Sequence, residues 1–310
     1  MDYTTFGRTG LHVSVMGLGC GGPSRVGQTT GSSEAESIAV IREALDAGVN
    51  FIDTAEAYGT EPLVGAALQG VARDQVVIST KKSYRKGISP DQVRESMEQS
   101  LRSLRTDYVD IYSLHGVLPS DYVRLRDEIL PVFYELRDQG KLRFVGVTEM
   151  FGDDTTHRML IESLPDDVWD VAMIGFNILN QTARDQVLPM TQAQNVAVQI
   201  MFAVRRALSR PDKLLEAIQE LVDAGQVDPK EVDAADPLGF VLEESDAASL
   251  VDASYRFVRY EPGVDVVLSG TGNPAHLKAN IESLNRPPLP DALVQKLRHI
   301  FRHASAVTGG

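Results

Sequence analysis

Four polar side chains of types suited to proton transfer follow three consecutive apolar runs of strand length. Asp53 and Tyr58 follow the first run, Lys81 the second and His115 the third. A phenol has a pKa of about 10, and an ammonium close to it favours the phenolate. A carboxylate can hold that ammonium in place, and an imidazole can donate a hydrogen bond to a carbonyl oxygen. Together the four groups would protonate a carbonyl oxygen as hydride arrives at its carbon.

Each of these residues has an ordinary structural interpretation when it is taken alone. Asp53 would be a cap or loop acceptor, Tyr58 would pack half-buried, Lys81 and Lys82 would form a solvated pair, and His115 would be a structural histidine. Enzymes built on β/α barrels place catalysis at the carboxyl ends of the strands. The occurrence of all four residues at three consecutive strand ends therefore favours the catalytic interpretation.

The elements that must position these side chains follow from the alternation of apolar runs with stretches of helical period. Eight strand–helix units without a Ser/Gly-rich linker predict a (β/α)8 TIM barrel, a single domain over residues 1–310. The alternative is an open doubly wound sheet. The expected strands are residues 13–18, 49–52, 76–78, 108–114, 142–147, 171–174, 196–200 and 264–268. The expected helices are residues 33–47, 62–68, 89–104, 121–140, 155–164, 181–193 with an interruption at Pro189, 212–224, one from near Ala247, one capped by Asn273 and Pro274, and 291–302.

The composition excludes several classes of protein. The 310 residues include 43 Asp+Glu and 30 Lys+Arg, and the formal net charge of −13 argues against nucleic-acid and anionic-membrane partners. One cysteine, Cys20, excludes an intramolecular disulfide and a Cys-rich zinc site. The sequence shows no signal-peptide pattern, no membrane-length apolar run and no metal-type spacing of histidines. We therefore expect a cytoplasmic protein that binds no metal and acts on a small molecule.

A glycine-rich motif directly follows the first expected strand. Residues 17–22 match G-x-G-x-x-G, which in a dinucleotide-binding sheet opens a helix that holds the pyrophosphate. Here the loop of residues 23–31 follows instead of a helix, so we reject that interpretation. The glycines are better explained as allowing a tight turn at a barrel mouth, close to a ligand.

Five segments carry a resemblance to a known family. Residues 6–14, 51–59, 78–81, 105–115 and 140–148 resemble segments of the aldo-keto reductases, and the resemblance extends over about residues 3–285. It implies that the first ten residues form a β-hairpin that plugs the bottom of the barrel. It also implies hydride transfer between a nicotinamide, usually NADPH, and an aldehyde, ketone or sugar, without a metal.

The same resemblance implies a role for each candidate residue. Tyr58 would be the general acid/base, Lys81 would lower its pKa, Asp53 would pair with Lys81, and His115 would orient the substrate carbonyl. The residues implied to contact the cofactor are Gly19, Cys20, Asp53, Thr148, Glu149, Met173, Met201, Phe202, Val204, Gly270, Thr271, Gly272, His276 and Asn280.

The nicotinamide end departs from the pattern of the family. Thr148 and Glu149 replace the usual Ser-Asn pair that holds the carboxamide. An ionised Glu149 can accept the amide N–H but cannot serve the amide carbonyl. Met173 stands where the family has Gln, and Met201 stands where it has an aromatic ring. A methionine can pack against a ring face, more loosely than another ring does.

The phosphate end departs as well. Gly270 and His276 replace a typical Lys and Arg of the adenosine-phosphate motif. A neutral histidine gives weaker phosphate contacts than a permanently charged guanidinium. Lys278 and Arg25 are the cations that would compensate. NADPH remains the expected cofactor because the family usually uses it. The departures at Gly270 and His276 make NADH the alternative.

The departures leave two other functions open beside aldehyde or ketone reduction. One is an NAD-dependent sugar or polyol dehydrogenase, and the other is a low-turnover nucleotide-binding regulatory subunit. The sequence indicates neither the physiological substrate nor the oligomeric state. Loops 21–32, 117–122, 151–156 and 205–246 are expected to line the mouth, with any lid drawn from before residue 246. Candidate apolar walls are Phe151, Phe202 and Phe240.

Overall fold

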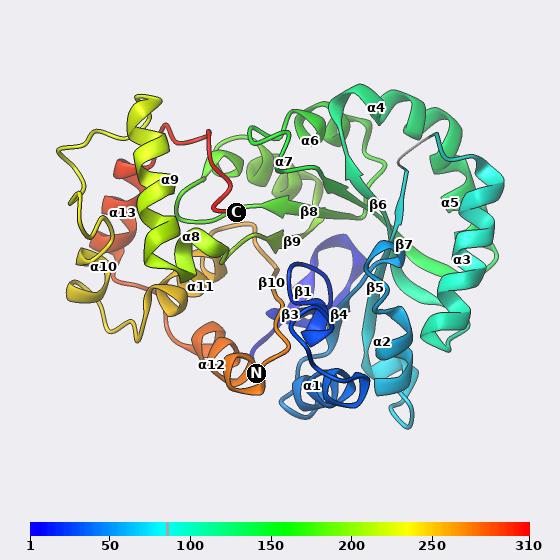
Figure 1. Ribbon diagram of the computed structural model, residues 1–310. Coiled ribbons are helices and arrows are strands. Elements are labelled where there is room, and N and C mark those ends of the chain that lie inside the picture. The colour runs from blue at the N-terminus through cyan, green and yellow to red at the C-terminus, as the bar shows by residue number, and fades with distance from the viewer. Residues whose placement is uncertain (85–86) are drawn as a thin grey trace.

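Eight parallel strands form a closed barrel in the computed structural model, which describes residues 1–84 and 87–310 (Figure 1). Each strand pairs with its neighbours in chain order, and the last strand closes the barrel by pairing with the first. The predicted (β/α)8 barrel is therefore confirmed, and the open sheet is excluded. The barrel strands are β3 (Met16–Gly19), β4 (Phe51–Asp53), β5 (Val77–Ser83), β6 (Val109–Val117), β7 (Leu142–Glu149), β8 (Val171–Gly175), β9 (Ala197–Met201) and β10 (Val266–Ser269).

Helices surround the barrel, and several begin at the residues that the sequence marks as caps. Ser33 and Ser89 each form a capping box, with Glu36 and Gln92 respectively, and Asn273 accepts from two amides of its helix. The helices are α1 (Glu34–Asp46), α2 (Glu61–Ala67), α3 (Pro90–Leu104), α4 (Pro119–Arg124), α5 (Leu130–Asp138), α6 (Arg158–Ser163), α7 (Val187–Gln194), α8 (Arg206–Ser209), α9 (Pro211–Asp223), α10 (Phe240–Glu243), α11 (Leu250–Arg259), α12 (Pro274–Asn285) and α13 (Asp291–Ile300).

Two expected helices differ because of where a proline falls. The helix expected over residues 121–140 is divided into α4, a π-helical turn at Leu125–Ile129, and α5. Pro131 lies at the start of α5, where its missing N–H interrupts the hydrogen-bond ladder. The interruption expected at Pro189 does not occur inside α7. That proline lies in the first turn, whose N–H groups have no partner within the helix in any case.

A short hairpin closes the bottom of the barrel. β1 (Tyr3–Phe6) pairs antiparallel with β2 (Leu11–Ser14), so the hairpin is somewhat longer than the first ten residues. The strand expected over residues 13–18 is therefore two elements, because Val15 separates β2 from β3. Phe6 and Val13 are fully buried in an apolar cluster with residues of the lower barrel, including Phe51.

Short polar side chains join neighbouring strands at this lower end. The backbone N–H groups of Ser14, Ile78, Val145 and Val198 donate at 2.7 to 2.9 Å to side-chain oxygens at, or one residue before, the start of a later strand. These bonds fix neighbouring strands relative to one another, and hence which side chains reach the upper end. The four accepting residues are Asn50, Asp110, Asp170 and Asp265.

Strands β5 and β6 are longer than the sequence predicts. In their pairing, Lys81 lies opposite Ser113, and Ser83 lies opposite His115. Lys81 and His115 therefore lie within strands rather than after them. The backbone pairing continues past the apolar runs because ladder hydrogen bonds do not depend on side-chain polarity, and alternation directs every second side chain into the barrel.

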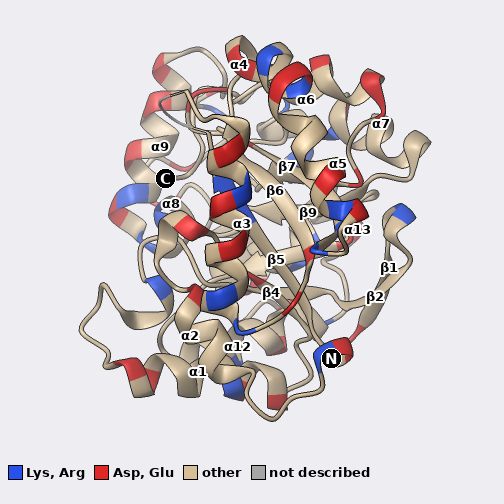
Figure 2. Cartoon of the chain, turned by 90° about the vertical axis from the view of Figure 1, so that its right-hand side faces the viewer, with Lys and Arg blue, Asp and Glu red and all other residues tan. Residues whose placement is uncertain are grey.

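Charged residues of both signs are interleaved on the outer helices, as Figure 2 shows. Arg94 of α3, for example, pairs with Glu135 of α5 at 2.6 Å. Exposed pairs of this kind contribute little each. Within the described residues, no helix is long and apolar enough to cross a membrane.

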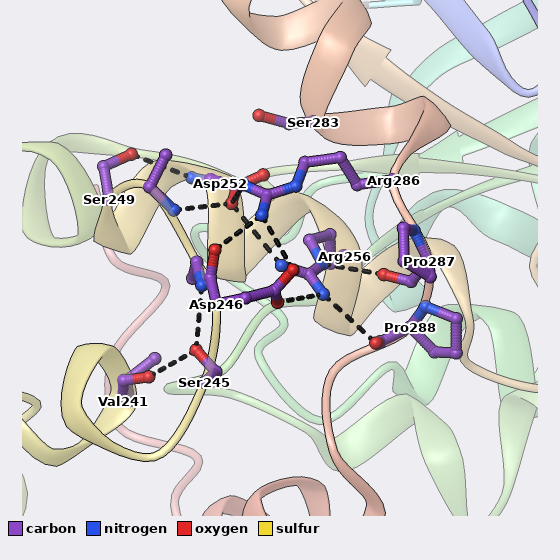
Figure 3. A network of polar contacts seen from close by, with 12 residues as sticks. Val241, Ser245, Asp246, Ser249, Asp252, Arg256, Ser283, Arg286, Pro287 and Pro288 are labelled. Carbon is purple, nitrogen blue, oxygen red and sulfur yellow. Dashed lines mark hydrogen bonds and ion pairs between the residues drawn. The ribbon is translucent and has the colours of Figure 1, made fainter.

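A polar network around the buried Arg256 holds the segment before α11 to the end of α12 (Figure 3). The Arg256 side chain is 1 % exposed, and it donates to the carbonyl oxygens of Pro287 and Pro288 at 2.8 and 3.1 Å. It also pairs with Asp246 at 2.8 Å. Arg286 pairs with Asp246 and, at 2.6 Å, with Asp252. The network anchors one end of the long segment of residues 202–265 between β9 and β10.

Candidate active site

A cavity of about 390 Å³ opens at the carboxyl ends of the barrel strands. Three of the four candidate catalytic residues line it, namely Asp53, Tyr58 and His115, and Lys81 lies buried beside them. The remaining lining residues are Gly19, Gly21, Gly22, Pro23, Gly116, Thr148, Glu149, Met150, Phe151, Gly152, Met173, Met201, Phe202, Val204, Arg205, Leu268 and Gly270.

Lys81 is fully buried and has three hydrogen-bond acceptors. Its ammonium donates to both carboxylate oxygens of Asp53, at 2.6 and 2.7 Å, and to the carbonyl oxygen of Thr54 at 2.7 Å. Ser79 donates to the same carboxylate at 3.1 Å. Burial by itself lowers the pKa of Lys81, but the charges of Asp53 and Tyr58 outweigh it and the pKa is raised. The side chain is therefore held as an ammonium.

Tyr58 follows β4 in a short 3-10 turn, Glu56–Tyr58. Its hydroxyl lies 3.1 Å from Nε2 of His115, and the Lys81 ammonium lies 5.2 Å from the centre of its ring. Burial raises the pKa of Tyr58, and the charges of Lys81 and Arg25 offset this only in part. Lys81 thus lowers the pKa as expected, but desolvation of the phenolate is the larger effect, so the net direction is upward. The phenol is therefore protonated at neutral pH, as a proton donor must be.

Gly21 explains the glycine-rich motif. A Cβ at this position would lie 2.4 Å from Cε2 of Tyr58, so only glycine allows the ring to occupy its place. Ser83 Oγ lies 3.3 Å from Nδ1 of His115, so both ring nitrogens of His115 have polar partners. The glycines thus allow a close approach at the barrel mouth, and the ring orientations of Tyr58 and His115 are fixed by contacts.

The end of the cavity where the sequence predicts the nicotinamide contains a buried cluster that the sequence did not indicate. Both carboxylate oxygens of Glu149 lie within 2.9 Å of Nδ1 of His157, and one accepts the Gly175 N–H at 2.7 Å. The ring of Phe151 stacks on His157 at 5.3 Å, and Thr182 Oγ1 lies 2.9 Å from Nε2 of His157. Glu149 lines the cavity, but its carboxylate is already held by the cavity wall. Its expected contact with the carboxamide stays a prediction.

Thr148 and the methionines lie at the cavity as expected. Thr148 Oγ1 accepts the Gly116 N–H at 2.6 Å, which leaves its hydroxyl hydrogen available to donate. Met173 is paired in register with Gln199 of β9. The Gln199 amide is fully buried, and neither of its polar atoms has a partner among the described residues. A glutamine is therefore present next to the strand position where Met173 replaces one, and no sequence signal indicated it.

Two residues expected at the cofactor, Cys20 and Asn280, line neither this cavity nor a second hollow near α1. Cys20 is fully buried in the apolar core, where burial raises the pKa of its thiol, and only its neighbours in the chain line the cavity. The side-chain amide of Asn280 donates to Ser269 at 2.9 Å in the interior. Phe151 and Phe202 line the cavity as expected, whereas the Phe240 ring packs under Lys296 elsewhere.

A second hollow, of about 640 Å³, lies between α1 and the start of α12. A Cβ at Gly272 would lie 2.3 Å from the backbone of Gly27, and one at Gly270 would lie 2.7 Å from the carbonyl oxygen of Gly19. The position of the family's typical lysine is therefore closed to a side chain here. The lining residues are Ser24, Thr30, Ser32, Glu36, Ala39, Val40, Thr271, Gly272, Asn273, Pro274 and His276.

The expected mouth loops contribute unequally. Loops 21–32, 151–156 and 205–246 supply cavity residues, but residues 117–122 do not, because α4 packs against α6 instead. Among the described residues, no group of three or more His, Cys, Asp or Glu side chains is arranged to hold a metal ion.

Comparison with known proteins identifies the family. The sequence model of the Aldo/keto reductase family matches residues 16–302, and the chain belongs to that family of NAD(P)-dependent oxidoreductases. The chain is 29 % identical to aldo-keto reductase YhdN of Bacillus subtilis, over 90 % of this chain and 87 % of that protein. It is 29 % identical to the NADH-specific methylglyoxal reductase of Escherichia coli, over 67 % of this chain and 69 % of that protein. A solved aldo/keto reductase of Klebsiella pneumoniae in complex with NADP and acetate has a TM-score of 0.69 at 22 % identity, over 96 % of this chain and 95 % of that one.

Proposed function

We propose that this protein reduces the carbonyl group of a small aldehyde, ketone or sugar, with Tyr58 as the general acid. One observation carries the proposal. The Tyr58 hydroxyl lies 3.1 Å from Nε2 of His115. The buried Lys81 ammonium, which donates two hydrogen bonds to Asp53, lies over the face of the Tyr58 ring. Proton donation to a carbonyl oxygen requires a positioned acid, a group that stabilises its conjugate base and a second donor that orients the oxygen. The three groups meet these requirements.

Each residue at the cavity has a separate role in the proposed reaction. When a nicotinamide is bound, it supplies the hydride. His115 positions the carbonyl oxygen beside the Tyr58 hydroxyl, and Tyr58 gives up its proton at that oxygen. The Lys81 ammonium then stabilises the phenolate, and Asp53 keeps Lys81 charged and in place. Phe151, Met201 and Leu268 exclude water from the reacting atoms. The same groups serve alcohol oxidation in the reverse direction.

The residues present fit a nicotinamide dinucleotide. Residues of segments 19–24 and 270–273 line both the cavity and the second hollow, so the two lie along the same pair of segments. Thr148, Met173 and Met201 would hold the nicotinamide end, and Thr271 and Gly272 would hold the adenosine end. The sequence predicts NADPH with NADH as the alternative. The names of the two relatives support both, since one is NADH-specific and the other was solved with NADP.

The experiment follows the oxidation of NADH and NADPH with a panel of methylglyoxal, 4-nitrobenzaldehyde and aldoses. We expect Tyr58→Phe to lower kcat by about 10² to 10⁴ fold while the affinity for the cofactor stays the same. A Tyr58→Phe variant with full activity would overturn the assigned mechanism. Turnover of the wild type at ordinary rates also argues against a regulatory subunit. We expect the cytoplasm to be its location, which fractionation of the source cells would test.

A further inference from the structure

The second hollow contains a carboxylate that the adenosine-phosphate motif does not include. Thr271, Gly272 and His276 line it from the motif itself, whereas Glu36 enters it from the first turn of α1. α1 and α12 lie side by side (Figure 1), although the two helices are far apart in the sequence. The tertiary structure thus places an acidic side chain in the hollow that the motif residues line.

Glu36 is held in position by local hydrogen bonds. Its Oε2 accepts from the backbone N–H and from the hydroxyl of Ser33, both at 2.7 Å. These hydrogen bonds from Ser33 lower the pKa of Glu36, so the side chain is ionised at neutral pH. Since these bonds engage only Oε2, the other carboxylate oxygen is left to accept from a ligand in the hollow.

Groups that would attract a phosphate are few at this hollow. Of the described residues that line it, none is Lys or Arg, and neither Lys278 nor Arg25 is among them. The start of α12 would ordinarily offer free N–H groups to an anion. Here Asn273 Oδ1 accepts from the N–H groups of Ala275 and His276, at 2.8 and 3.4 Å. The helix start is therefore capped by its own side chain.

We infer that Glu36 selects NAD(H) against NADP(H). The inference rests on the proposed function, because it assumes that a dinucleotide occupies the site. The Glu36 carboxylate accepts a hydrogen bond from the 2′-hydroxyl of the adenosine ribose, which NADP(H) lacks because its extra phosphate is esterified there. It also repels that phosphate, and no lysine or arginine of the hollow compensates. Discrimination thus comes both from a favourable contact with one ligand and from an unfavourable contact with the other.

The test is direct binding of NADH and NADPH, measured by isothermal titration calorimetry without substrate. The variant is Glu36→Gln, which keeps the capping box because glutamine serves at that position as well. The matched control is Glu34→Gln, which removes a charge from the same helix turn but does not line the hollow. We expect the wild type and the control to bind NADH at least about tenfold tighter than NADPH. We expect Glu36→Gln to reduce that ratio by about tenfold, and less at high salt.

Each outcome has a distinct meaning. Tighter binding of NADPH by the wild type overturns the inference but leaves the proposed function standing. An unchanged ratio in Glu36→Gln, or an equal change in Glu34→Gln, also overturns it, because the discrimination then does not come from this carboxylate. If neither nucleotide binds to the folded wild-type protein, the proposed function itself fails, and the inference fails with it.

Discussion

The Lys81 ammonium donates hydrogen bonds to both oxygens of the Asp53 carboxylate, at 2.6 and 2.7 Å, although the two residues are 28 positions apart. β4 and β5 are neighbours in the barrel, and alternation directs both side chains inward. The pair is buried, so its desolvation is costly and each partner depends on the other. We propose that the pair is buried here because its ammonium acts on Tyr58.

Removing the ammonium tests this dependence. In Lys81→Met, Asp53 becomes an unpaired buried carboxylate, and we expect the free energy of unfolding to fall by about 3–5 kcal/mol. The double variant Lys81→Met with Asp53→Asn should recover stability, because it buries no charge. It should not recover kcat, because Tyr58 still lacks the cation that stabilises its phenolate. Urea denaturation and steady-state kinetics separate the two effects, and an active double variant would contradict the assigned role.

The contact between Gly21 and Tyr58 gives a second expectation. In Gly21→Ala, the new methyl group would lie 2.4 Å from the ring, so the ring must move. We expect kcat to fall by about 10² fold, because a displaced acid no longer meets the carbonyl oxygen. Gly152→Ala is the control, since it lines the same cavity and its Cβ would meet nothing within 4 Å. Equal kinetics of the two variants would show that the Tyr58 ring tolerates displacement.

Asp265 gives an expectation for pH dependence. Burial raises its pKa to about 6, and the hydrogen bond from the Val198 N–H lowers it only in part. Arg73 and Arg143 pair with Asp110 at the same end of the barrel. No such cation pairs with Asp265 among the described residues. A raised pKa in the folded state means that stability is lost as pH rises from about 4 to about 6.

The substitution Asp265→Asn should remove this loss while keeping an acceptor for Val198. We expect the variant and the wild type to have similar Tm values at pH 4, where the carboxyl is protonated in the folded state. At pH 7 the variant should be the more stable protein. Thermal unfolding across this range provides the measurement, and a Tm difference that does not change with pH would rule out Asp265 as the titrating group.

The network around Arg256 gives an expectation in which stability changes while activity does not. Arg256→Lys keeps the charge but loses the planar fork that reaches two prolyl carbonyl oxygens and Asp246. We expect the free energy of unfolding to fall by about 1–3 kcal/mol. Since the network lies away from the cavity, kcat and KM should stay within about twofold. A marked change in kcat at unchanged stability would show that the segment between β9 and β10 takes part in turnover.

The sequence predicted the barrel, and the convergence of the four candidate residues at one end of it, for physical reasons that can be named. Ser33, Ser89 and Asn273 mark helix starts because a cap is a local interaction between a side chain and the next few amides. Asp53 and Lys81 were predicted at strand ends because parallel strands carry continuous apolar runs up to the mouth. The strand boundaries were less accurate, since β5 and β6 continue beyond those runs through backbone pairing.

By itself, the sequence thus determined the number of strand–helix units, the starts of the helices capped by Ser33, Ser89 and Asn273, and the residue types at the candidate site, all of which depend on local order. Only the tertiary structure decided the contact of Gly21 with Tyr58, the burial of Glu149 against His157, and the position of Glu36 in the second hollow. The physical reason is that these contacts depend on how loops, helix ends and strand ends pack against one another around the closed barrel, which the local order of residues does not fix.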